Sequence, residues 1–236
     1  VKAPDTETLL GFLNEMEFRT LTKRIADQMG VEPPSPPETE TVGGGDAPEQ
    51  VEMPEIDPDS YETVTTADQL QTWIDRIYER GYVAIDTETT GLNEMTADLV
   101  GISLCIEAGE ACYIPLTHKA GKGGDDDLFA DKDQDALAEG QIPLDDALAA
   151  LKPLLEDPSV MKIGQNMKYD AKIFARNGIA IAPIDDTMLM SYAMNAGQHG
   201  HGMDTLAERY LSHTPIPIKD LLGSGKSMIT FDRGPI

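Results

Sequence analysis

Residues 83–92 have the sequence Val-Ala-Ile-Asp-Thr-Glu-Thr-Thr-Gly-Leu, in which an apolar run leads directly into acidic residues. The apolar and β-branched residues predict a short buried strand, and Asp86 and Glu88, two positions apart, then project from the same face of it. Two adjacent carboxylates repel each other unless a cation lies between them, and their oxygens are ligands that Mg²⁺ or Mn²⁺ prefers. A solvated acidic strand end followed by a Thr-Gly turn would also explain this stretch on its own.

A second informative segment lies about eighty residues further along the chain, at 160–170, with the sequence Val-Met-Lys-Ile-Gly-Gln-Asn-Met-Lys-Tyr-Asp. It predicts a strand at 160–163, a turn at Gly164, and a helix that begins near Met167 with Asn166 as its N-cap. Asp170 then lies in the first turn of the helix. The helix dipole favours a carboxylate there whatever its function, so Asp170 alone is weak evidence.

Together, Asp-Thr-Glu-Thr-x-Gly-Leu and Gly-Gln-Asn-x-Lys-Tyr-Asp resemble the first two motifs of the proofreading 3′–5′ exonuclease domain of the bacterial DNA polymerase I family (family A). More broadly, they resemble the 3′–5′ exonucleases defined by four acidic residues. The likeness continues through Asp-Thr-Met-Leu at 186–189 and Gly-Met-Asp-Thr-Leu-Ala-Glu-Arg at 202–209, and so covers residues 60–236. It implies an α/β, ribonuclease-H-like fold with a mixed central sheet flanked by helices.

The resemblance also implies a chemistry. Two divalent metal ions, Mg²⁺ or Mn²⁺, would be held by Asp86, Glu88 and Asp170, with Asp86 bridging both ions, to hydrolyse the terminal 3′ phosphodiester bond of DNA. A single-stranded or frayed 3′ end would be the substrate, and the polymerase domain of the same parent chain would be the partner. The positions that match substrate-binding residues of the family are Thr89, Leu92, Gln165, Asn166, Lys168 and Tyr169.

One departure from the family concerns the last acidic motif, Tyr-x-x-x-Asp. Tyr192 is followed at that spacing by Ala196, and Tyr210 by Thr214. The chain also begins with Val1, so we expect a fragment of a longer protein, truncated before this motif and with an incomplete site.

A sister branch of the superfamily uses His-x-x-x-x-Asp instead, a spacing that His199 and Asp204 share. The surrounding residues fit a structural segment better, with His199 and His201 in a loop and Asp204 as the N-cap of the helix that follows.

Composition predicts three regions. Residues 1–30 contain a short amphipathic helix with Leu9, Leu10, Leu13, Met16 and Phe18, which the resemblance assigns to the tail of a 5′-nuclease region. Residues 31–60 hold nine acids, seven prolines and no Lys or Arg, and predict a flexible linker. Residues 61–236 form the predicted exonuclease domain. Within it we expect a helix from residue 65 to Gly81, strands at 99–106 and 111–116, a mobile acidic insertion at 117–146, and a helix at 144–155.

The net charge of −24 superficially opposes binding to nucleic acid, but the linker carries −9 and the insertion −6 of it. Lys162, Lys168, Lys172, Arg176 and Arg209 could form a modest basic rim. The sequence contains no zinc pattern, nucleophilic triad or phosphate-binding loop. It also shows no signal peptide or membrane span, and its two cysteines lie in predicted strands as buried thiols. We therefore expect a bacterial cytoplasmic location. A non-catalytic scaffold that supports the polymerase, and a related RNA exonuclease, are the alternative functions.

Overall fold

The computed structural model describes residues 4–16, 18–35, 60–120, 136–225, 228–234 and 236. The chain divides into two units, residues 1–50 and 51–236. Most of the predicted linker, at 36–59, and the centre of the predicted insertion, at 121–135, lie outside the described residues. Among the described residues, no helix is long and apolar enough to cross a membrane.

The first unit contains two helices, α1 (Thr6–Glu15) and α2 (Arg19–Met29), which pack against each other. The prediction of a single helix here is wrong, because Met16 ends α1 and Phe18 is already the N-cap of α2. Leu10 and Leu13 are buried together with Ala26 of α2, so the two helices share one small core.

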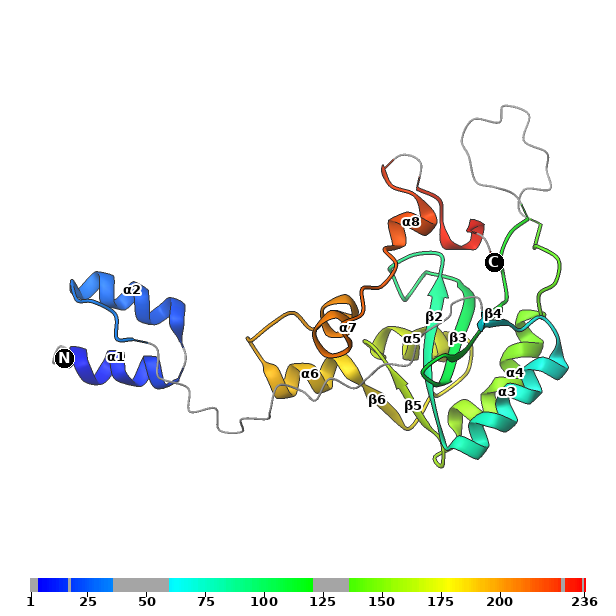
Figure 1. Ribbon diagram of the computed structural model, residues 1–236, viewed down its shortest axis with the longest axis horizontal. Coiled ribbons are helices and arrows are strands. Elements are labelled where there is room, and N and C mark those ends of the chain that lie inside the picture. Colours follow the sequence, from blue (N-terminus) through cyan, green and yellow to red (C-terminus); the bar gives the residue numbers. More distant parts are fainter. Residues whose placement is uncertain (1–3, 17, 36–59, 121–135, 226–227, 235) are drawn as a thin grey trace. The chain divides into compact units, whose positions relative to one another are not determined.

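The second unit is built on a six-stranded mixed sheet with the order β1-β4-β3-β2-β5-β6 (Figure 1). The central hairpins are antiparallel, whereas β1 with β4, β2 with β5, and β5 with β6 are parallel pairs. The strands are β1 (Glu62–Thr63), β2 (Tyr82–Thr89), β3 (Leu99–Glu107), β4 (Glu110–Pro115), β5 (Met161–Gly164) and β6 (Ile184–Asp186). The predicted α/β fold with a mixed sheet is therefore confirmed.

Local signals in the sequence account for the boundaries of these elements. Helix α3 (Ala67–Arg80) begins with a capping box between Thr66 and Gln69 and ends at Gly81, which has a φ of 80°. The β3–β4 hairpin turns between Glu107 and Glu110, in the interval between the two predicted strands. Helices α4 (Leu144–Glu156) and α5 (Lys168–Arg176) also lie where the apolar periodicity placed them.

One face of the sheet carries the hydrophobic core. Its buried strand residues pack with apolar side chains of α3, α4 and α5, and α3 and α4 lie side by side over the strands (Figure 1). The chain then continues through α6 (Thr187–Asn195), α7 (Met203–Leu211), α8 (Ile218–Leu222) and the 3₁₀ turn η3 (Phe231–Arg233), which contacts β2. Helix α7 has no buried residue.

Candidate active site

The end of β2 brings two of the predicted carboxylates together. Val83, Ile85 and Thr87 are buried on the core face, whereas Asp86 and Glu88 are half-buried and alternate with them on the opposite face. The pairing with β3 is regular up to Glu88 and shifts directly after it. The prediction that the two acids share one face is confirmed, and the regular register with β3 ends just beyond them.

Asp170 reaches the same strand end from the first turn of α5. The parallel pairing of β2 with β5 ends at Ala84 and Ile163, so the edge of β2 beyond that point is open to another partner. There, Asp170 Oδ1 accepts hydrogen bonds from the backbone N–H of Thr87 at 3.1 Å and from its hydroxyl at 2.5 Å. Only 2% of Asp170 is exposed. The two segments identified in the sequence therefore meet at one end of β2.

The shifted pKa values of these three acids show how unfavourable their charges are in this buried position. Burial, followed by the charge of Asp170, raises the pKa of Asp86 to about 6. Burial and the charges of Asp86 and Asp170 raise the pKa of Glu88 to about 7. Burial also raises the pKa of Asp170, although its bonds from Thr87 act in the opposite direction. A bound divalent cation would relieve this repulsion.

The donor set fits such a cation, because carboxylate oxygens are hard ligands. In this conformation, however, no three His, Cys, Asp or Glu side chains of the described residues are grouped so that they could hold a metal ion. Both bonds from Thr87 end on the same oxygen of Asp170, so this carboxylate is turned onto the strand through one oxygen.

Two predicted substrate residues form a hydroxyl cluster beside the acids. The Thr89 hydroxyl lies 2.6 Å from the Tyr169 hydroxyl, and the Gly91 carbonyl lies within 2.9 Å of Thr89 Oγ1 and 2.6 Å of the Tyr169 hydroxyl. This cluster ties the loop after β2 to α5. Leu92 follows directly in that loop, and 96% of it is exposed.

The turn between β5 and α5 contains the next predicted residues, Gln165 and Asn166. Gln165 Nε2 donates to the His201 carbonyl at 2.7 Å, which connects the turn to the loop before α7. The prediction of Asn166 as N-cap is wrong: α5 begins at Lys168 with Met167 as its N-cap, and Asn166 has a φ of 61°. Lys168 is exposed on the first turn of α5.

Asp186 explains the unusual backbone of Asn166, and sequence reasoning missed its role. Its carboxylate accepts from the backbone N–H groups of Asn166 at 3.1 Å and Met167 at 2.9 Å. It also accepts from Met188 at 2.9 Å and Leu189 at 3.2 Å, as the N-cap of α6. One side chain therefore holds the turn and starts the next helix. An Asp directly before an apolar helix was the available signal.

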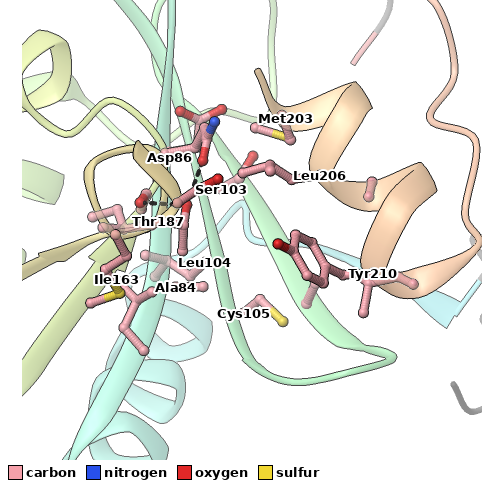
Figure 2. A pocket seen from close by; sticks show the side chains of 18 of the residues that line it. Ala84, Asp86, Ser103, Leu104, Cys105, Ile163, Thr187, Met203, Leu206 and Tyr210 are labelled. Carbon is pink, nitrogen blue, oxygen red and sulfur yellow. Dashed lines mark hydrogen bonds between the residues drawn. The ribbon is translucent and has the colours of Figure 1, made fainter. Parts of the chain in front are cut away.

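An apolar groove of about 750 Å³ lies between α6, α7 and the face of the sheet that carries Asp86. Figure 2 shows Met203, Leu206 and Tyr210 of α7 opposite the strand residues Ser103 and Cys105. Because nearly all of its lining atoms are apolar, the groove contributes packing surface next to the acidic cluster rather than charged groups.

Some other predicted residues lie away from the cluster. The placement of Lys162 in a basic rim is wrong, because Lys162 is fully buried and its ammonium donates to the carbonyls of Asp157 at 2.9 Å, Val160 at 2.7 Å and Ala182. Asp204 lies inside the first turn of α7, whose N-cap is Gly202, so the predicted cap is also wrong. His199 lies in a loop, as predicted, with its ring near those of His201 and Tyr210.

Comparison with protein families identifies residues 61–233 as matching a family described as 3′–5′ exonuclease. The chain is 39% identical to the DNA polymerase I of Rhizobium leguminosarum over 95% of its length, and 34% identical to that of Pseudomonas aeruginosa over 98%. The matched regions are 27% and 22% of these two relatives, so the chain spans about a quarter of their length.

Among solved structures, the exonuclease domain of Aedes aegypti Nibbler resembles the chain with a TM-score of 0.52 and 10% identity. The match covers 78% of this chain and 83% of that domain. At this identity the likeness concerns the fold, and it agrees with the ribonuclease-H-like arrangement expected from the sequence.

Proposed function

The chain belongs to the 3′–5′ exonuclease family of DNA polymerase I, and we propose that it is the proofreading part of such a polymerase, which removes mismatched 3′ nucleotides from DNA during replication and repair. The observation that carries this proposal is the convergence of Asp86, Glu88 and Asp170 at the end of β2, two of them with pKa values raised toward neutrality. Groups with such pKa shifts gather at functional sites.

Asp86, Glu88 and Asp170 would together hold two divalent ions, Mg²⁺ or Mn²⁺. When bound, such ions supply an activated water and stabilise the charge on the leaving oxygen. The chain itself contributes the orientation of the ligands. Thr87 fixes Asp170 through Oδ1 alone, which leaves Oδ2 as the oxygen for a metal.

The substrate would approach along the loop after β2 and the start of α5. The Thr89–Tyr169 hydroxyl cluster sets the position of this loop, and exposed Leu92 is placed to contact the terminal base. Asn166 and Gln165 would bind near the scissile phosphate, and Lys168 would contribute an exposed positive charge. Because Lys172 is paired with the Glu94 carboxylate and Arg176 donates to the carbonyls of Glu94 and Ala97, we propose that the polymerase domain of the parent protein delivers the single-stranded 3′ end in the bacterial cytoplasm.

The test is cleavage of a 5′-labelled single-stranded DNA with the chain in excess, in Mg²⁺ or Mn²⁺, so that even a slow single turnover is visible. We expect stepwise loss of 3′ nucleotides that stops in EDTA and in Asp86→Ala. Glu79→Gln, an exposed acid of α3, is the matched control and should cleave as the wild type does. Shortening that is unchanged in Asp86→Ala would contradict the catalytic proposal, whereas a wild-type chain that leaves the DNA intact would agree equally with a non-catalytic scaffold and with the expected lack of the last acidic motif.

A further inference from the structure

The loop that follows β2 is bound by α5 at several points along its length. The Gly91 carbonyl accepts a hydrogen bond from the Tyr169 hydroxyl at 2.6 Å. Further along, the Glu94 carboxylate accepts from Lys172 Nζ at 2.6 Å, and the Glu94 carbonyl accepts from Arg176 at 3.2 Å. The three donors lie at positions 169, 172 and 176, a spacing that places them along one face of the helix.

The same loop is closed at its base and folded within itself. The Thr90 N–H donates to the Asp98 carbonyl at 3.0 Å, and the Asp98 N–H donates to the Thr90 hydroxyl at 2.9 Å. Inside the loop, the Asn93 carbonyl accepts from the N–H of buried Ala97 at 2.8 Å, and Arg176 donates to the Ala97 carbonyl. Connecting segments are usually mobile, whereas these bonds fix the 91–97 loop against α5.

The bonds of Gly91 and Glu94 flank Leu92 on both sides. Because 96% of Leu92 is exposed, the ordering of this side chain is not offset by burial among the described residues. A fixed and exposed apolar group is preorganised for an apolar partner, since its entropy is already lost before the partner binds. The base of a nucleotide offers such a surface, and apolar side chains are known to insert next to bases.

Helix α5 also carries one of the three acids. Asp170, in its first turn, is bonded to Thr87 of β2. Since a helix rises about 1.5 Å per residue, α5 is a rigid spacer of about 9 Å between Asp170 and Arg176. The position of the loop relative to the acids is therefore set through this one helix.

We propose that Lys172 and Arg176 are positioning residues: they fix the 91–97 loop against α5, so that Leu92 is held at one place beside the acids and contacts the base of the 3′-terminal nucleotide. This inference rests on the proposed function, because it concerns the placement of the DNA end at that site. The rival role for the two cations is direct attraction of phosphates, which would not depend on the terminal base.

The experiment measures binding of the whole chain to two 5′-fluorescein-labelled single-stranded DNAs by fluorescence anisotropy in Ca²⁺, with a gel to verify that the DNA stays intact. One DNA ends in a normal 3′ nucleotide, and the other ends in an abasic nucleotide that lacks only the base. The ratio of the two affinities isolates the terminal base, because net charge affects both DNAs equally. We expect the wild type to bind the normal end about 5-fold more tightly.

Glu94→Lys and Lys172→Glu each turn the ion pair into a repulsion and should lower this ratio about 3-fold. The double variant Glu94→Lys/Lys172→Glu restores the pair at the wild-type net charge and should recover the ratio. Arg176→Lys keeps the charge but loses the fork that reaches two carbonyls, so it should also lower the ratio. Lys152→Glu is the matched control, because Lys152 forms an equally short and similarly exposed ion pair in α4, and it should leave the ratio unchanged.

Leu92→Ala should lower the ratio as well, and Glu94→Lys added to it should lower the ratio no further, because the loop acts through this side chain. Near-ultraviolet circular dichroism of each variant verifies that its fold is retained. A ratio that is unchanged in Glu94→Lys and Lys172→Glu, or that the charge swap does not recover, would overturn the inference. A wild-type ratio of one would overturn it too. None of these results bears on Asp86-dependent shortening of DNA, which tests the proposed function separately.

Discussion

Replacing Asp86 by Asn should stabilise the metal-free chain while abolishing metal binding. A pKa of about 6 in place of the ordinary 3.8 means that the ionised carboxylate is disfavoured in the folded state. Since a tenfold change in an ionisation constant corresponds to about 1.4 kcal/mol, the free energy of unfolding should rise by about 3 kcal/mol at pH 8. For a chain of this size, each kcal/mol raises Tm by about 2–4 °C, so we expect an increase of about 6–12 °C.

The pH dependence of this gain follows from the direction of the shift. Because the pKa of Asp86 is raised on folding, the folded state binds more protons than the unfolded state between pH 3.8 and about 6. Wild-type stability therefore falls as the pH rises through this window, and the loss is complete above it. The Asn variant lacks this titration. Its advantage should be about half as large at pH 5 as at pH 8.

The assay is urea unfolding of both proteins in EDTA at pH 5 and pH 8, followed by circular dichroism. Glu79→Gln, which removes an exposed acid, should unfold as the wild type does at both pH values. Adding Mg²⁺ should raise the stability of the wild type at pH 8 but not that of Asp86→Asn, because only the former retains the ligand. A variant that is less stable than the wild type at pH 8, or a gain independent of pH, would refute the reasoning that burial and the charge of Asp170 disfavour the ionised Asp86 carboxylate.

Three further substitutions should lower the free energy of unfolding, each measured by urea denaturation. Lys162→Met removes the ammonium that donates to four backbone carbonyls and should cost about 3 kcal/mol; a loss below 1 kcal/mol would show that water replaces the ammonium. Asp186→Ala removes the acceptor of four backbone N–H groups and should cost about 2–4 kcal/mol. Asp186→Asn keeps one acceptor oxygen and should lose less stability than Asp186→Ala. Gly101→Ala meets the Tyr113 hydroxyl and should cost about 1–3 kcal/mol, whereas Gly91→Ala, with open space around it, should cost less than Gly101→Ala; equal effects would contradict the packing argument.

Much of the architecture was accessible from local patterns. Alternation along β2 predicted that Asp86 and Glu88 share a face, and the Thr66 capping position and Gly81 marked the ends of α3. These features depend on the period of a strand or on hydrogen bonds within a few residues, and both are set by neighbouring positions in the chain. The family motifs then placed Asp170 with the acids, from more than eighty residues away.

The remaining features depend on how distant segments meet. Asn166 adopts its left-handed backbone because Asp186, twenty residues later, accepts the N–H groups of its turn. Lys162, which the sequence offered as a surface cation, is buried because carbonyls from separate loops converge on it.

The sequence by itself therefore determined the identity of the acids, the strand and helix that present them, and the class of chemistry they suit. The tertiary structure decided that Asp170 is bound to Thr87 across the open edge of β2 and that Tyr113 lies over Gly101. The physical reason is that local periodicity acts between neighbours, whereas these contacts depend on strand register and helix packing, which many residues set jointly.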